Sequence, residues 1–265
     1  MGVATVACDL ARAATVAAGR LAAQLAAQAA ACLRNLCADR ASCARPLEAA
    51  GACSALAGLL RPFRGDGEVV LNAARALAKL SAHENTRRGL HGDERALLDM
   101  ADALLDAHAR RDDDRANAVV VRLAFCLGNL TASHDENRKV AGTRAAPLVA
   151  ALAASARDFL RESQGDDQVL IKLIRLVANA SIRPSAGVGV ASDDGIACLP
   201  SLLREALRRD REELALNATG PRGIVLRTES RRAAAADNSA EAGAAAAAAD
   251  NSAEAELAGA RRGRG

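Results

Sequence analysis

The sequence contains no tryptophan, no tyrosine and only three phenylalanines among its 265 residues. Proteins that stack nucleic-acid bases need several aromatic rings, so this shortage argues against that mode of binding. Aromatic and β-branched residues are also typical of β-strands, whereas this chain is rich in alanine and leucine, which favour helices and allow them to pack closely. The composition therefore predicts an all-α protein.

The sequence also lacks the motifs that are typical of enzymes, metal sites and membrane spans. The seven cysteines include no C-x-x-C pair, and their odd number is typical of a reducing compartment. No glycine-rich phosphate loop follows a strand pattern, and no Gly-x-Ser-x-Gly elbow occurs. No uncharged apolar run reaches about 18 residues, the length of a membrane span. We therefore expect no enzyme activity, no cofactor, no metal and no membrane insertion.

The chain instead carries a five-residue motif that occurs four times. Its copies are Leu33–Cys37, Leu77–Ser81, Leu127–Thr131 and Val177–Ser181. The third residues of the copies are separated by 44, 50 and 50 residues, since they are Asn35, Lys79, Asn129 and Asn179. Self-similarity at this period is typical of stacked helical units.

Two faces are expected on the helix that ends in each motif, and its length is expected to be about 12–15 residues. The first face consists of the positions that lie six and two residues before the third residue of the motif and one residue after it. These positions are apolar in all four copies, which predicts that this face is buried. Positions seven and four before the third residue lie with it on another face. This second face is polar in every copy and basic in three of them.

Each unit is expected to contain two further helices. Asn and Asp in the polar turns at residues 82–85 and 133–137 are expected to cap a short helix. This short helix is expected to end near a glycine, namely Gly51, Gly92, Gly142 or Gly195. A second apolar helix follows, and a charged link then leads to the long helix. We place the links at residues 61–68, 106–117 and 158–168.

The sequence predicts two regions. Residues 1–219 form the helical repeats, in units that end near Cys37, Ser81, Thr131 and Ser181. The last unit is expected to be truncated and to expose apolar surface, because Pro221 stops its long helix before a fifth motif. Residues 220–265 are low in complexity and rich in alanine, so we expect a disordered tail.

The unit resembles the armadillo repeat, which has three helices and an asparagine late in the third. This resemblance implies a right-handed α-solenoid whose third helices line a concave side, where the asparagines contact extended peptides. Asn35, Asn129 and Asn179 match those asparagines, and Lys79 departs from the pattern.

Three segments resemble an armadillo protein of motile cilia more closely: Arg122–Thr131, Val169–Ser181 and Glu212–Asn217. This resemblance implies a non-enzymatic scaffold in the assembly of motile cilia and flagella, linked to delivery of axonemal components. It also implies a location in the cytoplasm and in the cilium or flagellum.

The expected binding residues are ten positions on the polar face, which we call the ladder: Asn35, Asn72, Arg75, Lys79, Arg122, Phe125, Asn129, Lys172, Arg175 and Asn179. Its basic residues favour a protein partner with an extended acidic segment.

Three other interpretations of the ladder remain open at this point. The face is the solvated side of amphipathic helices, or it belongs to a peptide receptor of the import or signalling type, or it binds nucleic acid. Import receptors carry tryptophan four residues before each asparagine, where this chain has Ala31, Arg75, Phe125 and Arg175.

Overall fold

Every element in the described part of the chain is an α-helix. The computed structural model describes residues 2–17, 19–38, 40–110, 113–132, 134–161, 167–180 and 199–219, with only the backbone at 40–44, 86, 199 and 219. The helices are α1 (Val3–Val16), α2 (Arg20–Leu36), α3 (Arg40–Ala49), α4 (Ala52–Leu60), α5 (Gly67–Ser81), α6 (Glu84–Arg88), α7 (Glu94–His108), α8 (Asp114–Ala132), α9 (Asp135–Gly142), α10 (Ala145–Arg161), α11 (Asp167–Ala180), α14 (Leu199–Arg208) and α15 (Glu212–Thr219).

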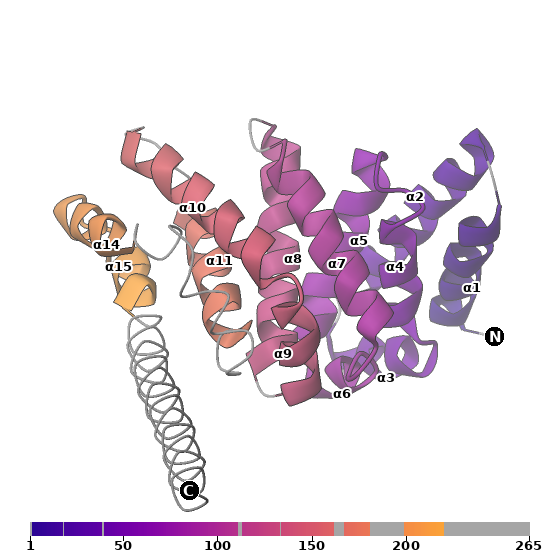
Figure 1. The fold of residues 1–265 in the computed structure, drawn as a ribbon. Helices are drawn as coiled ribbons and strands as arrows, with labels where there is room; N and C mark the ends of the chain where they lie inside the picture. The colour runs from indigo at the N-terminus through magenta and orange to yellow at the C-terminus, as the bar shows by residue number, and fades with distance from the viewer. Residues whose placement is uncertain are drawn as a thin grey trace, which may run out of the picture. The chain divides into compact units, whose positions relative to one another are not determined.

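The helices form two layers that repeat along the chain (Figure 1). The long helices α2, α5, α8 and α11 pack side by side in chain order, and α15 follows α11. Helices α1, α4, α7, α10 and α14 form the second layer, and the short helices α3, α6 and α9 lie along one edge. This arrangement confirms the predicted all-α solenoid of repeating units.

Contacts divide the chain into two compact units, Met1–Ile224 and Val225–Gly265, and all described residues lie in the first. The tail that we expect from residue 220, and the turn at Gly195, lie outside the described residues.

The expected helix and link lengths were partly wrong. Helices α2 and α8 contain 17 and 19 residues, which exceeds the expected length. Helices α7 and α10 continue to His108 and Arg161, so the links are shorter than expected. Alanine, leucine and arginine sustain a helix even where the sequence becomes charged. The start of α5 is fixed by Asp66, whose side chain accepts hydrogen bonds from the backbone N–H groups of Glu68 and Val69.

The expected Asn and Asp caps in the polar turns were wrong as well. The N-cap residues of α6 and α9 are His83 and His134. Asn137 of α9 is fully buried and forms hydrogen bonds to two other segments. Its Nδ2 donates to the carbonyl of Leu130 at 3.0 Å, and its Oδ1 accepts from the N–H of Gly92 at 3.0 Å. Gly92 has a φ of +73°, which a glycine adopts without strain.

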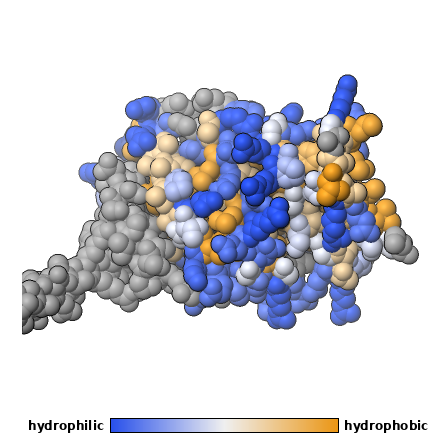
Figure 2. Space-filling model, turned by 45° about the vertical axis from the view of Figure 1, so that its right-hand side comes forward, coloured by the Kyte–Doolittle hydropathy of each residue, from blue (hydrophilic) through white to orange (hydrophobic). Residues whose placement is uncertain are grey.

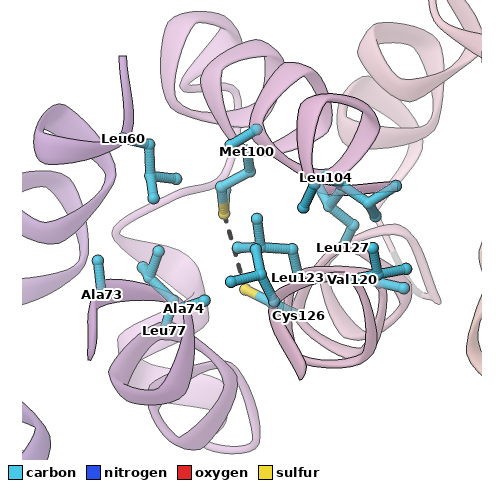
Figure 3. Packing of buried hydrophobic residues seen from close by; sticks show 14 of the residues in the cluster. Leu60, Ala73, Ala74, Leu77, Met100, Leu104, Val120, Leu123, Cys126 and Leu127 are labelled. Atoms are coloured by element: carbon cyan, nitrogen blue, oxygen red, sulfur yellow. Dashed lines mark hydrogen bonds between the residues drawn. The ribbon is translucent and has the colours of Figure 1, made fainter. Parts of the chain in front are cut away.

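The apolar face is buried as predicted. Eleven of the twelve predicted positions are buried, and Leu36 is half-buried. Figure 3 shows Met100 and Leu104 of α7 pointing toward Leu123 and Leu127 of α8. The Cys126 thiol donates to the Met100 sulfur at 3.8 Å. Burial raises the pKa of Cys126 to about 12, so this cysteine is a protonated core residue.

Hydrophobic side chains are exposed where the stack begins and ends. Figure 2 shows them gathered at the end formed by α1. The exposed large hydrophobic residues are Val3, Val6, Leu10, Val16 and Leu21 at this end, and Leu207 and Leu216 on α14 and α15. No helix among the described residues is long and apolar enough to cross a bilayer.

We predict that Asn137→Ala destabilises the fold, because the carbonyl of Leu130 and the N–H of Gly92 lose their partners inside the protein. The expected loss in the free energy of unfolding is roughly 2 kcal/mol. Urea unfolding followed by circular dichroism measures it. Asn85→Ala is the matched control, since Asn85 is an exposed asparagine in the equivalent turn of the preceding unit. Equal stability of the two variants contradicts the prediction.

Candidate protein-binding surface

The structure brings the ladder residues together on the four long helices, but it does not expose them equally. Arg75, Lys79, Arg122 and Arg175 are exposed, as is Asn35. Phe125, Lys172 and Asn179 are half-buried. Asn72 and Asn129 are buried, with 5% and 8% of their surface exposed. The ladder thus combines exposed cations with asparagines that face into the stack.

The asparagines link neighbouring long helices. Between α2 and α5, Arg34 donates from Nη1 to Asn72 Oδ1 at 2.7 Å. Between α5 and α8, Asn129 Nδ2 donates to Ser81 Oγ at 3.1 Å, and between α8 and α11, Asn179 Nδ2 donates to the carbonyl of Gly128 at 2.9 Å. Each of these three junctions therefore carries a side-chain hydrogen bond at the ladder, a role that the sequence analysis did not predict.

The cations of the ladder have no ionic partner within the described residues. Arg75, Lys79, Arg122 and Arg175 make no ion pair or hydrogen bond there through their side chains. Arginines elsewhere pair with carboxylates, for example Arg144 with Asp102 at 2.7 Å and Arg211 with Asp167 at 3.0 Å. The surface over the long helices therefore carries positive charge that described carboxylates do not neutralise.

Phe125 and Lys172 contact each other across the junction of α8 and α11. The Lys172 ammonium lies 5.9 Å from the centre of the Phe125 ring, which is within the range of a cation–π interaction. This contact places Lys172 beside the one aromatic ring of the ladder. Phe125 therefore contacts the Lys172 ammonium in the free protein.

A recess of about 430 Å³ lies between α2 and α5 and reaches the start of α8. It contains the ladder residues Asn72 and Arg75, together with three charged residues that the sequence analysis missed: Arg34, Glu68 and Arg115. Glu68 lies eleven residues before Lys79 and Arg115 fourteen before Asn129, so both extend the helical spacing of the ladder face toward the N-terminus. Following that spacing for one more turn from Asn72 identifies Glu68, and for two more turns from Arg122 identifies Arg115.

The histidines occupy structural positions. His108 and Ser155 form a buried hydrogen bond of 2.8 Å, and the rings of His91 and His134 stack at 4.0 Å. Burial, and then the charge of His134, lowers the pKa of His91. The described residues contain no group of three or more His, Cys, Asp or Glu side chains that could hold a metal ion.

We predict that two ladder asparagines differ in their effect on stability. Asn129→Ala removes the buried link to Ser81 and is expected to lower the free energy of unfolding by about 1–2 kcal/mol. Asn35→Ala removes an exposed side chain whose contact is with Arg34 on the same helix, so we expect little change. Thermal and urea unfolding of both variants measures this, and equal stability contradicts a stacking role for Asn129.

Comparisons with known proteins agree with the repeat architecture. No protein-family model matches the chain. Armadillo repeat-containing protein 2 from Homo sapiens is 27% identical over 180 residues, which is 60% of this chain and 20% of that protein. The proteins of the same name from Bos taurus and Mus musculus are 28% identical over 174 residues and 27% identical over 184 residues, covering 58% and 63% of this chain and 19% and 20% of theirs.

The matched region spans about a fifth of the length of these relatives. The similarity to these relatives lies in the repeat region of the chain. The helices, their two layers and the recurring asparagines agree with a repeat protein. The chain is an all-α helical solenoid that is similar in sequence to armadillo repeat-containing protein 2.

Proposed function

We propose that this protein is a non-enzymatic scaffold that binds an extended acidic segment of a protein partner along the ladder. The observation that carries the proposal is the row of cations on α5, α8 and α11 that have no carboxylate partner among the described residues. Helical solenoids use their continuous surfaces for binding, and a partner that supplies carboxylates neutralises this charge.

The cellular setting that we propose is the assembly of motile cilia and flagella. It rests on the likeness to armadillo repeat-containing protein 2 and on the three resembling segments, of which Arg122–Thr131 carries ladder residues of α8. The proposed partner is an axonemal or ciliary-transport component that presents an acidic segment, and the proposed location is the cytoplasm and the cilium.

The ladder suits a peptide better than a nucleic acid. Its one aromatic ring already contacts Lys172, so bases find no stacking platform among the ladder residues. The cations lie on rigid helices, one or two on each of three, and such a row matches an extended chain that crosses the helices.

We predict that reversing three ladder charges strongly weakens partner binding. The variant is Arg122→Glu, Lys172→Glu and Arg175→Glu, and it places carboxylates where the partner's carboxylates bind, so we expect affinity to fall roughly tenfold or more. The measurement is affinity capture from an extract of flagellated cells with the wild-type and the variant as baits, followed by mass spectrometry.

The matched control reverses three exposed arginines away from the ladder: Arg110 in the turn after α7, and Arg157 and Arg161 on α10. Circular dichroism checks that both variants fold. Axonemal or ciliary-transport proteins captured by the wild-type and the control, and lost with the ladder variant, are the expected result. Capture that is unchanged in the ladder variant overturns the proposed surface, and recovery of nucleic-acid complexes supports the alternative partner.

A further inference from the structure

The recess between α2 and α5 concentrates hydrogen-bond donors. Arginines from three helices line it: Arg34 on α2, Arg75 on α5 and Arg115 on α8. Glu68 is the one carboxylate among the residues that line it. Three positive charges thus face one negative charge in a volume of about 430 Å³.

Contacts inside the protein occupy the guanidinium of Arg34 with uncharged acceptors and leave the guanidinium groups of Arg75 and Arg115 without acceptors among the residues that the structure describes. Arg34 bonds only to amide oxygens, those of Asn72 and Asn35, which carry no charge. The guanidinium groups of Arg75 and Arg115 have no hydrogen-bond or ion-pair partner among the described residues. Asn72 is 5% exposed and uses its Oδ1 for Arg34, while its Nδ2 has no acceptor in the described part of the chain.

We propose that this recess binds the phosphate group of a phosphorylated serine or threonine in the partner segment. A phosphate carries a charge of about −1.5 to −2 and three acceptor oxygens, and arginine binds it through two parallel hydrogen bonds. A carboxylate has two oxygens and one charge, so it leaves part of this donor set unsatisfied. Arg34 is already held in place by Asn72 and Asn35, which keeps one guanidinium oriented before the ligand arrives.

The inference rests on the proposed function, since it treats the recess as the N-terminal part of the same peptide-binding surface. It adds that phosphorylation of the partner strengthens binding. The carboxylates of the segment contact α8 and α11, while the phosphate occupies the recess between α2 and α5.

The test uses two degenerate peptide libraries that are rich in glutamate and differ only at one fixed serine, which is phosphorylated in one library. Both are passed over the immobilised full chain, and bound peptides are sequenced and their affinities measured by fluorescence anisotropy. We expect the phosphorylated peptides to bind about tenfold more tightly than their unphosphorylated counterparts.

Two variants locate the effect. Arg75→Gln with Arg115→Gln removes two donors that make no side-chain hydrogen bond in the stack, so the variant keeps the fold, and we expect it to lose the preference for phosphate. Arg34→Gln is the second variant, and circular dichroism shows whether the loss of the Asn72 contact affects folding. Arg157→Gln with Arg161→Gln is the control, and it is expected to keep the preference.

The outcomes separate this inference from the proposed function. Equal affinity for both libraries, with binding that is lost in the Arg122, Lys172 and Arg175 variant, overturns the phosphate site and leaves the acidic-segment surface standing. A phosphate preference that survives Arg75→Gln with Arg115→Gln also overturns the assignment to this recess. Competition by inorganic phosphate alone, at the concentration of the phosphopeptide, shows a free-anion site and overturns the partner-borne phosphate.

Discussion

No helical unit of this protein buries its long helix without its neighbours. Leu77 of α5 and Leu127 of α8 are almost completely excluded from water, and α5 packs against α2, α4 and α8, while α8 packs against α5, α7 and α11. The burial of each apolar face therefore depends on stacking, as in other quasi-one-dimensional repeat proteins. The same dependence accounts for the hydrophobic residues that remain exposed on α1 and on α14 and α15.

Small side chains make this stacking close, and polar links give it a register. Ala73 and Ala74 present methyl groups to the interface in Figure 3, where larger residues of the facing helices fill the space. Alanine buries little apolar area, so each alanine contributes less than a leucine to the free energy of folding. The amides of Asn129 and Asn179 add directional contacts to Ser81 and Gly128. Sliding one helix past the next leaves a buried amide without its partner, at a cost of about 1–3 kcal/mol.

The sequence predicts those features of the fold that depend on a single helix. The apolar positions around Leu33 and Leu173 follow the period of one helix, and that period alone determines which face is buried. Other features are not determined by that period. Weak local preferences decide the N-cap at His134 and the continuation of α10 to Arg161. The burial of Asn129 depends on residues that are distant in the sequence. Ser81, which binds Asn129, lies 48 residues earlier in the chain, so sequence spacing alone does not reveal that contact.

The candidate surface shows the same division. The basic character of Arg75, Arg122 and Arg175 follows from the repeat alignment, whereas their grouping with Arg34 and Arg115 becomes visible only when α2, α5 and α8 are placed side by side. The absence of carboxylate partners among the described residues is also a property of the three-dimensional arrangement.

The spacing of the long helices explains how these cations coexist in the free protein and still act together on a ligand. Packed helices lie about 8–10 Å apart, which is close to the Debye length in physiological salt, so like charges on neighbouring helices repel one another weakly. An extended peptide advances about 3.3 Å per residue, so a segment that crosses the helices meets a new row of cations about every third residue. Because the asparagine links hold the helices in register, the backbone positions of the cations are set before a partner binds, and the backbone of the solenoid loses little conformational entropy on binding.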